Sequence, residues 1–141
     1  MTEWEANFIA SHRVARLATI DAQGQPHIVP IVYAFDGDRL YTPVDAKPKR
    51  VSPFQLQRVR NIQANPSVGV LIDEYSEDWR RLAWVQVRGR AVTVQEGPQH
   101  AAAVRLLHDK YPQYAAMPLQ GRPIIVITSE RVTSWRAATV R

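Results

Sequence analysis

The sequence predicts one domain, residues 1–141, of the mainly-β (α+β) class: an antiparallel β-barrel of six to seven strands with short flanking helices. Runs of β-branched and aromatic residues are separated by hairpin turn signals, whereas helical signals occupy a few short stretches. The length of 141 residues is typical of a single domain, and 45% hydrophobic with 22% charged residues is ordinary for a globular protein.

The first third of the chain predicts a short helix followed by three strands. Thr2 and Glu5 form a capping-box pattern at the start of the helix. Strands then follow at 13–20, 27–35 and 39–44, with glycine-containing turns between them. Short turns between consecutive strands favour an antiparallel meander.

The rest of the chain alternates helices and strands. A helix in 55–65 ends at Asn65-Pro66, and a second helix begins around Pro98 and ends at Tyr111-Pro112. A loop is expected at 112–122. Strands are expected at 67–73, 83–95, 123–129 and 132–138, the last two as separate strands.

Two residues predict irregularities within strands. Pro30 has no N–H to donate, so the strand 27–35 must lie at a sheet edge or be bulged there. Gly89 lies in the middle of the strand 83–95, which suggests a bulge or a close approach of another backbone.

The net charge of +5 is confined to one stretch, residues 46–72, which contains five basic residues and no acid. Such a block predicts a local anion site, here in front of a helix whose N-terminus also favours anions. A solvated basic face remains an equal alternative. Because the basic residues form one block, a small phosphorylated ligand fits better than a nucleic acid. The five residues are Lys47, Lys49, Arg50, Arg58 and Arg60.

Other chemistries lack their usual patterns. The chain has no cysteine, its four histidines lack metal-ligand spacing, and no phosphate-binding glycine motif occurs. A cofactor is therefore expected to supply any reactivity, with His27, Tyr33 and Tyr41 as proton-donor candidates by position alone. Trp79, among charged residues, is expected to cover a ring system or a subunit interface. No apolar run is long enough to span a membrane and no secretory signal is visible, so we expect a cytoplasmic protein.

Motifs along nearly the whole chain resemble the pyridoxamine 5′-phosphate oxidase-like split β-barrels, also known as FMN-binding split barrels. The segment RVARLATIDAQGQPHIVPIVYAF resembles the opening strands of that family, and LQRVRNIQANPSVGVLID resembles its basic helix and following strand. DEYSEDWRRLAWVQVRGRAVTV resembles its next hairpin, and PIIVITSERVTSW its closing strands. Within the superfamily, the combination of KPKR, R-x-R-N-I-x-x-N-P and D-x-Y-x-x-D-W is similar to the branch of probable deazaflavin-dependent enzymes.

This resemblance implies a homodimer with two cofactor sites at its interface, a small-molecule substrate, and no nucleic-acid or membrane partner. It implies that a basic cluster meets the phosphate and acidic tail of the 8-hydroxy-5-deazaflavin coenzyme F-420, and that Trp79 reaches a cofactor, across the dimer. Because Arg58 and Arg60 flank the core-facing Val59, at most one of them can reach a given phosphate. The tail cluster would be Lys47, Lys49 and Arg50; the phosphate motif Arg58, Arg60 and Asn61; and the strand along the ring His27, Ile28, Val29 and Pro30.

The function implied is an oxidoreductase that uses F-420 to transfer hydride to or from a small organic substrate. The chain ends in VTSWRAATVR and lacks the R-L-x-[DN]-R segment with which true pyridoxamine-phosphate oxidases recognise their substrate. Vitamin metabolism is therefore disfavoured. An FMN-dependent reductase or oxidase on the same barrel, or a non-catalytic flavin or deazaflavin carrier, remains the alternative. A nucleic-acid-binding barrel is disfavoured because KPKR contains no aromatic residue.

Overall fold

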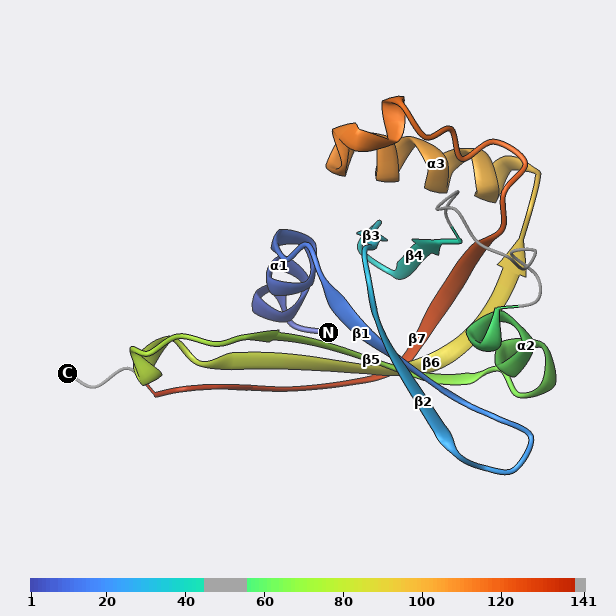
Figure 1. Cartoon of the computed structure of the whole chain (residues 1–141). Coiled ribbons are helices and arrows are strands. Elements are labelled where there is room, and N and C mark those ends of the chain that lie inside the picture. Colours follow the sequence, from blue (N-terminus) through green and yellow to red (C-terminus); the bar gives the residue numbers. More distant parts are fainter. Residues whose placement is uncertain (45–55, 139–141) are drawn as a thin grey trace.

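The computed structural model describes residues 1–44 and 56–138, which form a curled antiparallel sheet with three α-helices around it (Figure 1). The seven strands are ordered β2-β1-β5-β6-β7-β4-β3 in the sheet. The mainly-β fold predicted from the sequence is confirmed. The elements are α1 (Glu3–Ser11), β1 (Ala15–Ile20), β2 (Pro26–Ile31), β3 (Ala34–Phe35), β4 (Arg39–Pro43), α2 (Gln57–Ala64), β5 (Ser67–Glu74), η2 (Trp79–Arg81), β6 (Ala83–Val94), α3 (Pro98–Lys110), η3 (Pro112–Ala115) and β7 (Ile124–Arg136).

The helix signals act as predicted at the N-terminus. The Thr2 hydroxyl accepts a hydrogen bond from the Glu5 amide, and the Glu5 carboxylate accepts one from the Thr2 amide, completing the capping box of α1. At α3, Gly97 precedes the proline that opens the helix. Its φ of 96° lies in the region that favours glycine.

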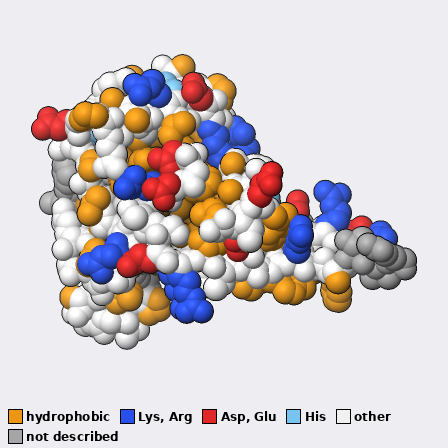
Figure 2. All heavy atoms as spheres, turned by 180° about the vertical axis from the view of Figure 1, so that it is seen from behind, with side chains coloured by type: hydrophobic (Ala, Val, Ile, Leu, Met, Phe, Trp, Pro, Cys, Tyr) orange, Lys and Arg blue, Asp and Glu red, His pale blue; other side chains and the backbone are white. Residues whose placement is uncertain are grey.

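Strands β5, β6 and β7 extend beyond the barrel as a three-stranded arm, and η2 connects β5 to β6 at its tip (Figure 1). Asp73 pairs with Trp84, which in turn pairs with Trp135, so these three side chains share one face of the arm. Figure 2 shows hydrophobic side chains exposed along the arm. Leu71, Tyr75, Trp79 and Trp135, from β5, the connection to β6, and β7, are exposed hydrophobic residues.

Both predicted irregularities are confirmed. Pro30 lies on β2, which is an edge strand of the sheet. The pairing of β6 with β7 shifts register between Arg88 and Gly89. A side chain at position 89 would collide with the backbone of Thr128, so the bulge requires glycine.

The closing segment differs from the prediction of two strands. Residues Ile124–Arg136 form one continuous strand, β7, which pairs with β4 in the barrel and with β6 over its whole length. In contrast, the run predicted at 27–35 divides into β2 and β3. The strand number stays within the expected range because the two differences offset each other.

Two hydrophobic cores organise these elements. The larger fills the inside of the curled sheet and includes Leu17, Leu40 and Ile72. The smaller lies between α3 and the β3–β4–β7 end of the sheet and includes Leu107 and Tyr111. Among the described residues, no helix is long and apolar enough to cross a membrane.

Candidate cofactor pocket

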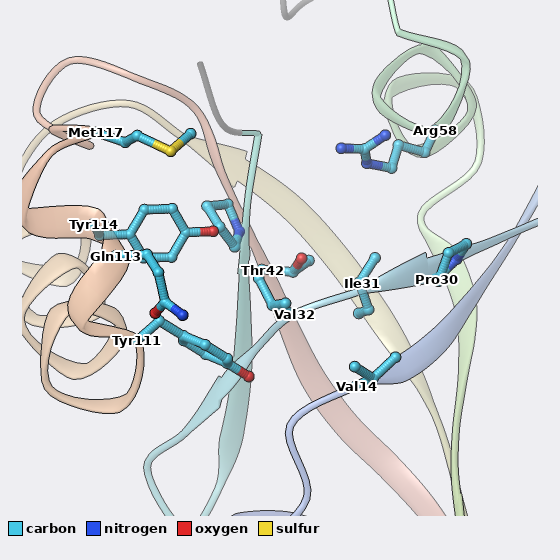
Figure 3. A pocket seen from close by; sticks show the side chains of 11 residues that line it. Val14, Pro30, Ile31, Val32, Thr42, Arg58, Tyr111, Gln113, Tyr114 and Met117 are labelled. Atoms are coloured by element: carbon cyan, nitrogen blue, oxygen red, sulfur yellow. The ribbon is translucent and has the colours of Figure 1, made fainter. Parts of the chain in front are cut away.

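A pocket of about 460 Å³ lies where the two ends of the sheet face each other (Figure 3). Strand β2 at one end contributes Pro30 and Ile31, and strand β4 near the other end contributes Thr42 and Pro43. The volume is in the range of small-molecule and cofactor sites. The remaining lining residues are Val14, Val32, Arg58, Tyr111, Gln113, Tyr114 and Met117.

One side of the pocket is basic. Figure 3 shows the Arg58 side chain extending from α2 over the space beside Pro30 and Ile31. Pro43 and Arg58, which both line the pocket, stand on either side of residues 45–55 in the sequence. The predicted tail-binding residues Lys47, Lys49 and Arg50 lie outside the described residues.

The other side of the pocket is neutral and largely aromatic. Tyr111, Gln113, Tyr114 and Met117 come from the end of α3, from η3 and from the turn that follows. The loop predicted from the sequence at 112–122 includes three of these residues, and no sequence motif identified them as part of a site. The segment Y-P-Q-Y at 111–114 places two aromatic residues around a proline at the end of a helix, and this pattern is the sequence feature that could have indicated the wall.

The free edge of β2 offers backbone groups next to the pocket. In an antiparallel pair, residues alternate between those that hydrogen bond to the neighbouring strand and those whose backbone groups point away. Pro30 lies opposite Arg16 of β1 but has no N–H, so these two residues cannot form a hydrogen-bonded pair. The backbone groups of Pro30 therefore point away from β1, and by alternation so do those of Ile28. This edge therefore presents the carbonyl oxygens of Ile28 and Pro30 and the amide of Ile28.

The side chains of the predicted ring-binding strand divide between two faces. Ile28 and Pro30 are exposed on one face, with Ile28 at 63%, whereas His27 and Val29 are partly buried on the other. The strand therefore brings Pro30 to the pocket, while His27, Ile28 and Val29 do not line it.

The three residues of the predicted phosphate motif also lie in different environments. Arg58 lines the pocket, whereas the Arg60 guanidinium is exposed and donates a hydrogen bond to Gln57 Oε1 at 2.7 Å. Asn61 is buried, donates from Nδ2 to Thr19 Oγ1 at 3.0 Å, and accepts from Gln57 Nε2 at 2.6 Å. Of these three residues, Arg58 is the one that the fold brings to the pocket.

Trp79 lies at the far end of the arm, in η2, and its side chain is 68% exposed. It does not line the pocket of its own chain. Its neighbours Asp78 and Arg80 form an ion pair with a 2.9 Å contact.

The hydroxyls of Tyr33 and Tyr41, the tyrosines named as proton-donor candidates, donate hydrogen bonds within the fold. The Tyr33 hydroxyl is buried and donates to the Ile9 carbonyl, and burial raises its pKa well above the usual range. The Tyr41 hydroxyl donates to Asp36 Oδ2 at 2.6 Å, and burial together with this carboxylate raises the pKa of Tyr41 to about 12. Within residues 1–44 and 56–138, no group of three or more metal-ligating side chains is brought together.

Several solved structures are similar to this chain. A conserved hypothetical protein from Mycobacterium tuberculosis shares 26% identity over 96% of this chain and 85% of its own, with a TM-score of 0.77. An FAD-binding protein from Mesorhizobium loti shares 24% identity over 98% of this chain and 96% of its own, with a TM-score of 0.70. An F-420 reductase shares 23% identity over 94% of this chain and 98% of its own, with a TM-score of 0.67. Heme-binding proteins also share the fold.

The sequence comparison identifies the family. No match is found among curated proteins. Residues 1–136 match the family described as pyridoxamine 5′-phosphate oxidase. The matched range includes all seven strands and all three α-helices of the described residues. The fold and this match agree, and the chain belongs to the pyridoxamine 5′-phosphate oxidase family.

Proposed function

We propose that this protein is an oxidoreductase that binds the deazaflavin coenzyme F-420 in the pocket between β2, β4 and α2 and transfers hydride to or from a small organic molecule. The observation that carries the proposal is the position of the pocket. Its lining includes Pro43 and Arg58, which flank in the sequence the basic segment with Lys47, Lys49 and Arg50. A single positive region of this kind suits a cofactor with a phosphate and a polyanionic tail.

The free edge of β2 supports a flat heterocycle in this position. The Pro30 carbonyl on this edge lies at the pocket and is an acceptor for an N–H group of a ring system bound there. Pro30 adds an apolar surface at the pocket rim. When bound, the coenzyme would supply the hydride chemistry, while the strand edge and Arg58 fix its orientation.

The neutral wall is the proposed place for the substrate. Tyr111, Tyr114 and Met117 provide apolar surface, and the Gln113 amide points into the pocket (Figure 3). This wall carries no charged side chain, whereas the opposite side carries Arg58. This division supports a proposal in which the anionic cofactor lies on one side and an uncharged molecule on the other.

We further propose a homodimer in which the arm of one chain approaches the pocket of the other. The arm exposes Tyr75 at 67% and Trp79 at 68%. Exposed aromatic side chains in one region are typical of an interface. Light scattering at tens of micromolar tests this; a monomer would contradict the shared site.

Titration of F-420 and FMN tests the cofactor assignment. We expect the wild type to bind F-420 more tightly than FMN, and Arg58→Met to weaken F-420 binding about tenfold, because a charge-assisted hydrogen bond contributes about 1.5–3 kcal/mol. Arg60→Met is the matched control, since Arg60 is on the same helix but exposed and bonded to Gln57. Equal effects of the two substitutions, or no binding of either cofactor, would overturn the proposal.

FMN is the second candidate, because the FAD-binding relative has the same fold and the pocket would accept the shorter phosphate of FMN. Tighter binding of FMN than of F-420 would favour it. A protein that binds either cofactor but transfers no hydride to any acceptor would instead be a carrier.

A further inference from the structure

A second cavity lies between α1 and the tip of the arm (Figure 1). Its volume of about 550 Å³ is in the range of small-molecule sites. Helix α1 contributes Trp4 and Phe8, and the tip contributes Arg80 and Arg81 from η2 and Arg136 from the end of β7. No described residue lines both this cavity and the cofactor pocket. We call it the arm-tip cavity.

One side of the arm-tip cavity is aromatic. Trp4 and Phe8 lie one turn apart on α1, with their ring centres 5.3 Å from each other. Phe8 is buried in the larger core and Trp4 packs against the same core, so both rings are held in place. The Arg136 guanidinium lies 4.8 Å from the centre of the Trp4 ring. The attraction of a cation to the face of the ring keeps the Arg136 charge next to this aromatic surface.

The other side of the arm-tip cavity is basic. Its three arginines face a single acidic lining residue, Glu74. Arg80 forms its ion pair with Asp78, whereas neither Arg81 nor Arg136 forms an ion pair within the described part of the chain. Like charges that converge on one cavity repel each other, which raises the free energy of this arrangement. Two positive charges beside an aromatic surface therefore remain available to an anion.

Hydrogen bonds fix the turn that carries two of these arginines. The Arg80 guanidinium donates to both carboxylate oxygens of Asp78, at 2.9 and 3.0 Å, and the Arg80 amide donates to Oδ1 at 3.2 Å. The Arg81 amide donates to the Asp78 carbonyl at 3.0 Å. A further bond, from the Ala137 amide to the Leu82 carbonyl at 3.0 Å, joins η2 to the end of β7. The backbone of the basic side is therefore ordered before any ligand binds, which lowers the entropic cost of binding.

We infer that the arm-tip cavity is a second binding site, which takes a small molecule composed of a flat aromatic ring and a phosphate group. A phosphate carries up to two negative charges and three acceptor oxygens, so it can meet the guanidinium groups of Arg81 and Arg136 together. The ring would lie against Trp4 and Phe8, where aromatic pairs are favourable. A phosphate without a ring would leave the aromatic side without contact, and a neutral ring would leave both charges uncompensated. The inference does not depend on the proposed function of the cofactor pocket.

Titration with phenyl phosphate, followed by the NMR signal of the Trp4 indole N–H, tests this site. Trp4→Phe identifies that signal among those of the four tryptophans. We expect a saturable shift, and affinity lowered about three- to fivefold by Arg81→Met and by Arg136→Met, the effect typical of exposed charge pairs. Arg90→Met is the matched control, because it removes an exposed arginine of β6 that does not line the cavity. Inorganic phosphate, phenol and the singly charged benzoate should each bind more weakly than phenyl phosphate.

Three results would overturn the site. They are an unshifted Trp4 signal, an effect of Arg90→Met equal to those at Arg81 and Arg136, and an affinity for phenyl phosphate no greater than that for inorganic phosphate. The melting temperatures of the variants, whose substituted side chains are exposed, should match that of the wild type.

The same titration with F-420 present separates this site from the cofactor pocket. We expect no competition, because the two cavities share no described lining residue. Competition would show that the anionic cofactor itself occupies the arm tip, and the second site would be wrong. If F-420 does not bind the protein at all, the proposed function fails, while the titration with phenyl phosphate still decides the role of the arm-tip cavity.

Discussion

Gly89 and the carbonyl of Thr128 are in such close contact that a Cβ at position 89 would lie 2.1 Å from the Thr128 oxygen. The contact lies at the register shift between Arg88 and Gly89, and Thr128 is the last residue of β7 that also pairs with β4. The register shift between β6 and β7 therefore depends on the absence of a side chain at position 89.

Gly89→Ala should destabilise the protein by about 1–3 kcal/mol, as expected when extra atoms force backbone shifts. Chemical denaturation measures this. Gly69→Ala is the matched control on β5, because its Cβ would meet only the Ala18 Cβ, at an ordinary 3.9 Å. We expect Gly69→Ala to change stability by less than about 0.5 kcal/mol. Equal effects of the two substitutions would show that the bulge relaxes without cost.

Asn61→Ala should lower the free energy of unfolding by about 1–3 kcal/mol, because the buried Thr19 hydroxyl and the Gln57 amide would lose their partner. Arg60→Ala, on the exposed side of the same helix, should be nearly neutral. Thermal denaturation and cofactor titration of both variants separate the roles. If Asn61→Ala instead lowered cofactor affinity without lowering stability, Asn61 would be a phosphate-binding residue, as its motif implies.

Asp36 should contribute to acid stability. Burial opposes its ionisation, but hydrogen bonds from the Arg39 amide, the Tyr41 hydroxyl and the Asp38 amide hold the pKa of Asp36 below its ordinary value of 3.8. Since the folded pKa is the lower one, the contribution is complete well above pH 3.8 and is lost as pH falls through the folded pKa. As pH falls from about 5 to about 3, the free energy of unfolding should therefore decrease less in Asp36→Asn than in wild type. Asp38→Asn, exposed in the same turn, is the control.

Trp79→Ala should reduce cofactor affinity more than stability. The side chain is 68% exposed, so its loss should leave the melting temperature nearly unchanged. A stacking contact is worth about 1 kcal/mol, or about fivefold in affinity. Val92→Ala, which removes an exposed apolar side chain from the β6 segment that pairs with Val126, is the control. A lower melting temperature with unchanged affinity would assign Trp79 to packing instead.

Lys49→Glu should weaken F-420 binding more than FMN binding, and the difference should shrink as salt rises. A polyanionic tail meets several positive charges, and exposed charges are screened within about 8 Å at 0.15 M salt. Titration of both cofactors at two salt concentrations measures this. Unchanged affinities would identify the KPKR cluster as a solvated surface.

The sequence by itself determined the class of fold and several of its details. The capping box at Thr2 and Glu5 acts within one turn of chain, and Pro30 and Gly89 act through the absence of an N–H or a side chain. Such signals need no knowledge of distant residues. The order of the motifs was sufficient to indicate the family, which the match over residues 1–136 confirms.

Only the tertiary structure decided which residues share the pocket. The neutral wall comes from the end of α3 and from η3, whose distance from β2 along the chain gives no sign of their proximity in space. The same holds for Arg58 and Asn61, three residues apart in one motif: the packing of α2 brings the first to the pocket and buries the second against Thr19. Local pattern fixes secondary structure because its causes are local, whereas a site formed between the two ends of a curled sheet depends on long-range packing that no short motif encodes.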